Sequence, residues 1–240
     1  MAFVLDKVVP WGRRLSEYQE MFCLSDRDLL DNKIISFGDG PASLNAEGSK
    51  IGGHIVSVDP LYQFSVTEIK NRIYETKAIV LEQTYKNRQN YIWDKIKSIS
   101  ELEKLRMSAM NLFLDDFEKG LAEKRYICGK LPDKTNFPDD SFDLGLSSHF
   151  LLLYSTLGWE FHLQSIKEML RICKEIRIFP TCDLDSQRTN LLSKVIHSFG
   201  NTYKIKIIKT SYQFQKNGYE MLIIAKHKKT ATAEKVTRDS

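Results

Sequence analysis

Apolar residues are grouped into short runs, and between the runs they recur with helical spacing. Each short apolar run that is stopped by glycine, proline or polar residues predicts a buried β-strand. These strands are expected at residues 33–37, 54–59, 125–128, 144–147 and 175–179. Helices are expected at residues 42–50, 160–174 and 191–199. The alternation of strand and helix predicts a doubly wound α/β fold with parallel strands.

The chain ends in two strands of a different kind. Residues 203–208 alternate polar and apolar side chains, as a half-buried strand does, and residues 219–225 form a last apolar run. Asn217 and Gly218, just before that run, are typical of a hairpin turn. We therefore expect a mostly parallel seven-stranded sheet with an antiparallel pair at one edge.

A charged segment without proline, residues 65–120, is longer than one crossover connection requires. Val66 and Ile69 begin one apolar helical face, and Leu102 begins another. Ser100 precedes acidic residues and is expected to cap the start of the second face. The segment predicts two or three helices that form a helical insertion in the α/β fold.

The 240 residues are enough for one well-buried core. We expect a single domain over residues 1–225. Within it, residues 1–32 form an N-terminal lead-in or lid and residues 65–120 the helical elaboration. Residues 226–240 are expected to be a disordered basic tail.

Charge and hydropathy narrow the class of protein. The formal net charge is +4, and the last sixteen residues contribute +3 of it, with five Lys or Arg against two Asp or Glu. The rest of the chain is near +1, so it lacks the strong basic stripe of a protein that wraps nucleic acid. No apolar stretch approaches the roughly 20 residues of a membrane helix, and no signal peptide is recognisable. We expect a cytoplasmic protein without a membrane partner, and the sequence leaves its oligomeric state open.

Metal and dithiol chemistry are disfavoured by the spacing of the possible ligands. No two of the four cysteines form a CxxC pair, so we expect them to be reduced and mostly buried. They are Cys23, Cys128, Cys173 and Cys182. The paired acids at 115–116 and 139–140 have no histidine nearby at ligand spacing and are expected to be turn and surface residues. No metal is expected.

One strand–turn–helix–strand unit carries the candidate chemistry. Gly38 and Gly40 follow the first strand, and Asp59 ends the second strand, 21 residues after Gly38. Glycines in such a turn let the backbone approach a ligand at the helix N-terminus, and the carboxylate accepts hydrogen bonds from ribose hydroxyls. The unit therefore predicts a site for a nucleotide-like ligand at the carboxyl ends of the strands.

These motifs resemble those of the class I S-adenosylmethionine-dependent methyltransferases, which have a Rossmann-like fold. Residues 34–42, Ile-Ile-Ser-Phe-Gly-Asp-Gly-Pro-Ala, are similar to the family's first motif, and residues 56–59, Val-Ser-Val-Asp, to its second. Residues 137–144, Phe-Pro-Asp-Asp-Ser-Phe-Asp-Leu, followed by residues 147–149, Ser-Ser-His, resemble its fourth-strand region. The resemblance covers about residues 33–225, and the Gly-Asp-Gly-Pro-Ala-Ser-Leu-Asn segment is similar to a bacterial group without an assigned substrate.

The resemblance implies S-adenosyl-L-methionine as the cofactor and assigns residues to its site. The implied cofactor-binding residues are Gly38, Asp39, Gly40, Pro41, Ala42, Asp59, Pro60, Leu61, Ser147 and Ser148. Asp39 is expected either to meet the methionine ammonium group or to cap the following helix. His149 is the candidate catalytic base, because it follows the fourth strand and its unperturbed pKa is about 6.5. The alternative is a histidine packed beside the apolar residues 150–153.

The chain departs from the family pattern at three places. Ser36 stands where the family places an acid two residues before the first glycine, and Ala42 stands in place of the third glycine. Residues 128–131, Cys-Gly-Lys-Leu, offer no acid to meet the adenine amino group. NAD is disfavoured because Ser43 occupies the last glycine position of the dinucleotide motif.

The N-terminal residues Trp11, Arg13 and Tyr18 have two interpretations. They fold over the cofactor as a lid, with Arg13 meeting a carboxylate through two hydrogen bonds, or they belong to a helix that packs on the sheet. His162 is expected on the surface of its helix.

The acceptor is narrowed only by negative observations. The chain has no Asn/Asp-Pro-Pro-Tyr/Phe motif, which in the family marks methylation of the exocyclic amines of bases. It also lacks the Pro-Cys nucleophile used for cytosine C5, because Cys182 follows Pro-Thr. A small-molecule acceptor is therefore favoured. The alternatives are a nucleic-acid or protein methyltransferase, with phosphates bound at Lys86, Lys95, Lys97 and the lysines of the tail, and a non-catalytic scaffold on the same fold.

Overall fold

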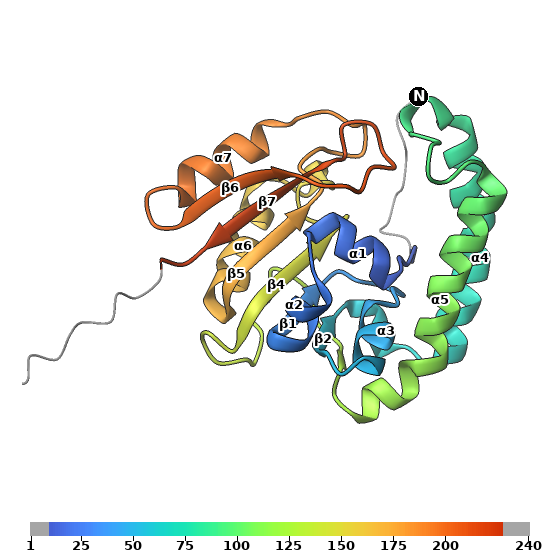
Figure 1. Ribbon diagram of the computed structural model, residues 1–240, viewed down its shortest axis with the longest axis horizontal. Coiled ribbons are helices and arrows are strands. Elements are labelled where there is room, and N and C mark those ends of the chain that lie inside the picture. Colours follow the sequence, from blue (N-terminus) through green and yellow to red (C-terminus); the bar gives the residue numbers. More distant parts are fainter. Residues whose placement is uncertain (1–9, 228–240) are drawn as a thin grey trace, which may run out of the picture.

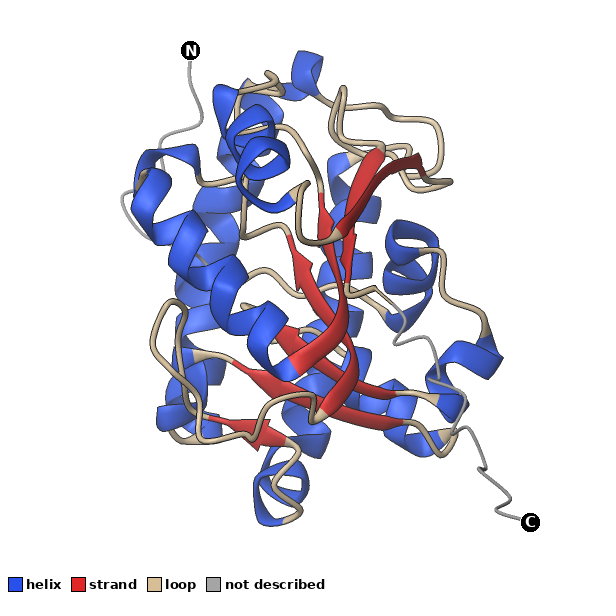
Figure 2. Cartoon of the chain, turned by 90° about the vertical axis from the view of Figure 1, so that its left-hand side faces the viewer, coloured by secondary structure: helices blue, strands red, loops and turns tan. Residues whose placement is uncertain are grey.

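A single seven-stranded sheet with helices on both faces forms the body of the protein (Figures 1 and 2). The computed structural model describes residues 10–227. The strands are β1 (Lys33–Phe37), β2 (His54–Val58), β3 (Tyr126–Ile127), β4 (Phe142–Ser148), β5 (Cys173–Phe179), β6 (Lys204–Lys209) and β7 (Glu220–Ala225). The α-helices are α1 (Leu15–Phe22), α2 (Asp26–Asp31), α3 (Leu44–Lys50), α4 (Val66–Lys86), α5 (Ile99–Ala122), α6 (Trp159–Ile172) and α7 (Asn190–Phe199). Three short 3₁₀ helices are η1 (Pro60–Gln63), η2 (Arg88–Asn90) and η3 (Ser155–Leu157).

The strand order β3-β2-β1-β4-β5-β7-β6 confirms the doubly wound α/β fold. Strands β1 to β5 are parallel, and β7 lies antiparallel between β5 and β6. The chain runs outward from β1 to β3 and then returns to place β4 on the other side of β1. The connections that follow β1 and β4 therefore leave the sheet in opposite directions. In such sheets the carboxyl ends of these two strands border a crevice that binds ligands.

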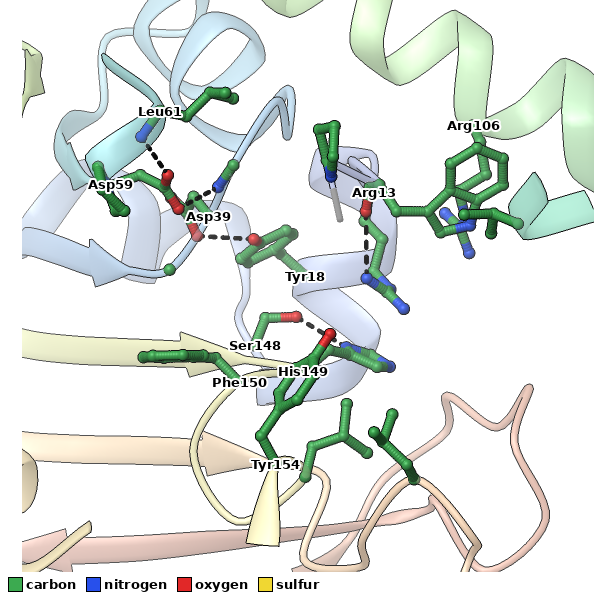
Figure 3. Close-up of a pocket in the computed structure, with 18 of the residues that line it drawn as sticks. Arg13, Tyr18, Asp39, Asp59, Leu61, Arg106, Ser148, His149, Phe150 and Tyr154 are labelled. Carbon is green, nitrogen blue, oxygen red and sulfur yellow. Dashed lines mark hydrogen bonds between the residues drawn. The ribbon is translucent and has the colours of Figure 1, made fainter. Parts of the chain in front are cut away.

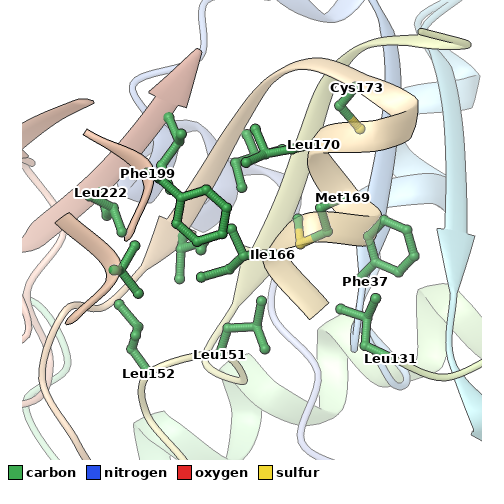
Figure 4. Packing of buried hydrophobic residues seen from close by; sticks show 14 of the residues in the cluster. Phe37, Leu131, Leu151, Leu152, Ile166, Met169, Leu170, Cys173, Phe199 and Leu222 are labelled. Carbon is green, nitrogen blue, oxygen red and sulfur yellow. The ribbon is translucent and has the colours of Figure 1, made fainter. Parts of the chain in front are cut away.

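Alternate residues of β1 face opposite layers of the core, because successive side chains of a strand point to opposite faces. Ile35 packs in the cluster built with α6 and α7, which includes Met169 and Phe199 (Figure 4). Ile34 packs in the cluster on the other face, which includes Phe22 of α1 and Leu44 of α3. Both faces of the central strands are thus covered, which explains their continuous apolar runs.

The long helices α4 and α5 lie side by side along one flank of the molecule (Figure 1). Their inner faces form a separate apolar cluster that includes Ile73 and Phe113. The expected N-cap at Ser100 is wrong. Ser98 holds that position, and its hydroxyl accepts a hydrogen bond from the backbone N–H of Glu101 at 3.1 Å. Ser100 lies inside the first turn of α5, whereas Ser98 is the last residue with extended backbone before the helix, which is the conformation of an N-cap.

The antiparallel pairing of the last two strands is confirmed, but the connection is not a tight hairpin. Residues 210–219 join β6 to β7 in a longer loop, with Asn217 at a φ of 61°. This loop and η2 meet through a bridge between Tyr91 and Gln215. The tail expected at 226–240 lies, from residue 228 onward, outside the described residues.

The expectation that the cysteines are mostly buried holds for two of the four. All four cysteines are unpaired, but only Cys173 and Cys182 are buried, whereas Cys23 and Cys128 are exposed. Cys23 ends α1 in a left-handed conformation at the surface. Within residues 10–227, no helix combines the length and the apolar character needed to cross a bilayer.

Candidate functional site

A cavity of about 370 Å³ opens at the carboxyl ends of β1, β2 and β4. Most of the expected cofactor and catalytic residues line it. These are Gly38, Asp39, Gly40, Asp59, Pro60, Leu61, Ser148 and His149. Pro41, Ala42 and Ser147 do not line the cavity. Ala42 is packed in the core, and the Ser147 hydroxyl accepts a 3.4 Å hydrogen bond from the Leu151 backbone, so both act in the packing below the site.

The turn after β1 depends on two glycines for different reasons. Gly38 has a φ of +72°, and a Cβ there would lie 2.9 Å from the ring of Phe150. Gly40 has a φ of +52°, and a Cβ there would meet no atom within 4 Å. Backbone with positive φ favours glycine in both cases. At Gly40 the missing side chain also leaves open space beside the backbone, as a turn that receives a ligand requires.

Asp59 is held at the end of β2 by two backbone donors. The N–H of Leu61 donates to its Oδ1 at 2.7 Å, and the N–H of Gly40 donates to its Oδ2 at 2.8 Å (Figure 3). Each carboxylate oxygen can accept a second hydrogen bond. Burial raises the pKa of Asp59 to about 6, and the charge of Asp39 adds to the rise, while the two N–H donors oppose it.

Asp39 turns away from the following helix and into a cage of hydroxyl groups. It accepts hydrogen bonds from Tyr18 Oη at 2.7 Å, Ser36 Oγ at 2.5 Å and Ser57 Oγ at 2.7 Å. It does not cap α3, whose N-cap position is Ser43. Burial raises the pKa of Asp39, and the three hydroxyl donors oppose the rise. A carboxylate therefore lies beside position 36 although residue 36 itself is a serine.

The segment before α1 is fastened to the glycine turn. Gly12 packs so closely that a Cβ would lie 2.1 Å from the carbonyl oxygen of Pro41. The backbone N–H of Ser43 donates to the carbonyl of Arg13 at 3.0 Å, and Arg14 forms an ion pair with Glu47 of α3 at 2.6 Å. These contacts place the Arg13 side chain at the cavity.

Arg13 itself has few partners. Its Nη1 donates a long 3.4 Å hydrogen bond to the carbonyl of Trp11, and its buried Nε has no hydrogen-bond partner. Among residues 10–227, no carboxylate lies within ion-pair distance of its guanidinium. Figure 3 shows the side chain reaching toward Ser148, His149 and Tyr154.

His149 lies at the end of β4 in a left-handed conformation with a φ of 53°. Its backbone N–H donates to the carbonyl of Phe179 at 2.6 Å, and its ring Nδ1 lies 2.9 Å from Ser148 Oγ. Burial, followed by the charges of Arg13 and Arg106, lowers the pKa of His149 well below its usual value. The imidazole is therefore neutral at pH 7.

A buried ion pair that the sequence analysis missed forms part of the cavity wall. Arg106 of α5 is 1% exposed, and its Nη1 donates to Glu17 Oε2 at 2.6 Å. Tyr212 joins them, donating to Glu17 Oε1 at 3.1 Å and lying 3.3 Å from Arg106 Nη2. One signal was present in the sequence, because Arg106 interrupts the apolar stripe of α5 between Leu102 and Ala109.

The remaining wall of the cavity comes from loops and carries no sequence pattern. We call it the aromatic side, defined by Trp11, Tyr91, Tyr154 and Phe214. The rings of Tyr91 and Phe214 stack with centroids 4.9 Å apart. The wall at the turn after β1, defined by Gly38, Gly40, Asp59 and Leu61, is called the glycine side.

His162, expected on the surface, is fully buried on α6, and that expectation is wrong. Its Nε2 lies 3.3 Å from the carbonyl of Tyr154, and burial lowers its pKa. The surface assignment failed because the loop between β4 and α6 folds over the first turn of the helix. His162 thereby supports the segment that carries Tyr154.

Comparison with known proteins gives one strong match. The uncharacterized protein MJ0045 of Methanocaldococcus jannaschii is 39% identical over 224 residues, which cover 92% of this chain and 97% of that protein. The chain belongs to the MJ0045 family. No model of a protein family matches the sequence.

Solved structures give weaker likenesses to this MJ0045 family member. A putative RNA methyltransferase from Pyrococcus horikoshii has a TM-score of 0.44 at 8% identity, covering 88% of this chain and 84% of that one. A putative S-adenosyl-L-methionine-dependent methyltransferase from Methanococcus maripaludis has a TM-score of 0.41 at 13% identity, with coverage of 91% and 85%. A possible histamine N-methyltransferase from Thermotoga maritima has a TM-score of 0.42 at 10% identity, covering 89% of each chain. At these TM-scores the likenesses assign neither a cofactor nor an acceptor to this chain.

Proposed function

We propose that the protein binds S-adenosyl-L-methionine on the glycine side of the cavity and transfers its methyl group to an acceptor bound beside it. One observation carries the proposal. The open space at Gly40 and the carboxylate of Asp59 lie on one turn, joined by the 2.8 Å hydrogen bond between Gly40 N and Asp59 Oδ2. A nucleoside ligand needs this combination of close backbone and ribose acceptor.

The side chains of the glycine side suit the parts of this cofactor. Asp59 keeps a free acceptor position on each oxygen for the two ribose hydroxyls, since its N–H donors use one position each. Leu61 and Leu131 line the same side and offer apolar surface for a base. Asp39 contributes negative charge beneath the turn, where a methionine ammonium group would be attracted to it. The remaining residues implied by the resemblance, Pro41, Ala42 and Ser147, shape the turn and the end of β4 in this proposal.

The chemistry divides between cofactor and chain. When bound, S-adenosyl-L-methionine supplies a methyl group activated by its sulfonium. The chain orients the acceptor and excludes water, which methyl transfer depends on. We assign His149 as the group that receives the acceptor's proton, because it lines the cavity and its imidazole is neutral at pH 7. Its lowered pKa makes it a weak base, so it serves an acceptor whose proton becomes acidic as the methyl group is transferred.

A small-molecule acceptor fits the cavity better than a polymer does. Its volume of about 370 Å³ and its aromatic side resemble pockets for small ligands. The lysines considered for phosphate binding are partly engaged elsewhere. Lys86 pairs with Glu82, and Lys95 pairs with Glu20 at 2.7 Å.

Calorimetric titration of the full chain tests the proposal. We expect both S-adenosylmethionine and S-adenosylhomocysteine to bind, NAD not to bind, and Asp59→Ala to weaken both affinities at least tenfold. The exposed Asp31, which pairs with Arg27 on α2, provides the matched control Asp31→Asn, which should bind as the wild type does. Absence of binding to a folded wild-type protein would refute the cofactor assignment and leave the non-catalytic scaffold as the function to pursue.

A further inference from the structure

The aromatic side of the cavity holds a positive charge without a matching acid. Arg13 and Arg106 both line the cavity. Arg106 is neutralised by Glu17 at 2.6 Å, with Tyr212 completing the cluster. Arg13 forms no ion pair with a carboxylate among the described residues. Its guanidinium donates a 3.4 Å hydrogen bond to the carbonyl of Trp11, and it acts on Tyr212 and, at longer range, on Glu17.

No lining residue of the cavity can supply the missing acid. Asp39 and Asp59 are the acidic residues among those that line it, and both lie on the glycine side. Asp39 already accepts hydrogen bonds from three hydroxyls, and neither acid forms an ion pair with Arg13 in the described part of the chain. Arg13 is half-buried with its Nε fully covered, and an anion that joins a partly desolvated cation stabilises it.

The position of Arg13 favours the acceptor over the cofactor as the source of that anion. Its charge acts to lower the pKa of His149, Tyr154 and Tyr91, which all line the cavity away from the glycine turn. It also acts on Tyr18, Glu17 and Tyr212, which lie around the start of α1. Figure 3 likewise shows the guanidinium extending from the segment before α1 toward His149 and Tyr154. An anion bound there would lie beside the proposed base.

The walls around Arg13 indicate what else the acceptor contains. Trp11, Tyr91, Tyr154 and Phe214 present aromatic surface, and Leu153 and Leu184 add aliphatic surface. Aromatic side chains pack well against planar rings in offset or edge-to-face arrangements. A guanidinium binds a carboxylate through two parallel hydrogen bonds.

We propose that the methyl acceptor is an aromatic acid whose ring packs on the aromatic side and whose carboxylate is bound by Arg13. This proposal rests on the proposed methyl transfer, because it names the acceptor of that reaction. The methyl group would go to another nucleophilic atom of the same molecule, which loses its proton to His149.

Paired probes separate charge from shape. The full chain, saturated with S-adenosylhomocysteine, is titrated by ligand-observed NMR with 4-hydroxybenzoate and 4-hydroxyphenylacetate, each beside its uncharged methyl ester. We expect at least one acid to bind tenfold or more tightly than its ester. Arg13→Gln should remove this preference and leave the ester affinity unchanged within twofold, whereas Arg13→Lys should retain part of it. Arg27→Gln, on the exposed surface of α2, is the matched control and should behave as the wild type does.

The Arg13 variants should fold, because it is the backbone carbonyl of Arg13 that anchors the segment to Ser43; melting temperatures check this. Equal binding of acid and ester to the wild type would overturn the proposal. So would a more than tenfold loss of S-adenosylhomocysteine affinity in Arg13→Gln with the acid preference intact, because Arg13 would then hold the cofactor's own carboxylate. The same titrations without S-adenosylhomocysteine show the acid preference even if the cofactor fails to bind, so failure of the proposed function is seen separately.

Discussion

Replacing Gly40 by alanine tests whether the open space at the glycine turn receives the cofactor. At a φ of +52° an alanine costs about 1–2 kcal/mol of stability through backbone strain alone. No atom lies within 4 Å of the new Cβ, so the substitution causes no steric clash in the ligand-free protein. A bound ligand would meet the methyl group, and overpacking of this kind costs about 1–3 kcal/mol. We therefore expect cofactor affinity to fall roughly tenfold to a hundredfold.

Gly158 provides the matched control. It also has a positive φ, +82°, and also has no atom within 4 Å of an added Cβ, but it does not line the cavity. Its ψ of 163° lies in a region that is almost exclusive to glycine, so the strain in Gly158→Ala is at least as large. Gly158→Ala should therefore lose stability and keep its affinity for S-adenosylhomocysteine.

Thermal unfolding with and without S-adenosylhomocysteine measures both effects. At a ligand concentration one hundred times the wild-type Kd, binding adds about 2.7 kcal/mol of stability. A thirtyfold weaker Kd leaves about 0.9 kcal/mol by the same relation. With roughly 2–4 °C per kcal/mol for a chain of this size, the ligand should raise the Tm of the wild type by about 5–11 °C and of Gly40→Ala by about 2–4 °C. An undiminished ligand-induced shift in Gly40→Ala would refute the placement of the cofactor at this turn.

Three further changes follow from the contacts around the cavity. Because the pKa of Asp59 is raised to about 6 and ribose hydroxyls bind the carboxylate form, calorimetry should show S-adenosylhomocysteine affinity falling about tenfold from pH 7.5 to pH 5; a flat profile would contradict the role of Asp59. Glu17→Gln leaves Arg106 buried without its counter-charge and should lower the free energy of unfolding in urea by about 3–5 kcal/mol. The double variant with Arg106→Met should recover much of this loss, and a loss below about 1 kcal/mol in the single variant would show the pair to be dispensable. Gly12→Ala drives a Cβ into the carbonyl of Pro41 and should cost about 1–3 kcal/mol in the same assay, and wild-type stability would show that the segment before α1 is not fastened there.

The sequence predicts the central sheet because its strands are buried on both faces. A strand such as β1, with four consecutive buried residues, leaves a continuous apolar run that has no other simple interpretation. The glycine turn and Asp59 are recognisable for a related reason, since positive φ and a strand-end acid restrict the residue type. Cap positions are less certain, because Ser98 and Ser100 both suit an N-cap and only the tertiary position of α5 decides between them.

Side chains brought together from distant segments are beyond the reach of pattern analysis. The sequence leaves two roles open for Asp39, contact with a ligand or capping of a helix. Its actual orientation is set by hydrogen bonds from Tyr18 and Ser57, which belong to other elements. The partnership of Arg106 with Glu17 joins residues 89 positions apart. The burial of His162 depends on a loop that covers its helix.

The most direct test of the account is a crystal structure of the full chain with S-adenosylhomocysteine bound. We expect both ribose hydroxyls within hydrogen-bond distance of the Asp59 carboxylate and the ligand filling the open space beside Gly40, with the aromatic side left free for the acceptor. A ligand bound elsewhere, or a ribose turned away from Asp59, would contradict the central claim that the glycine side is a methyl-donor site.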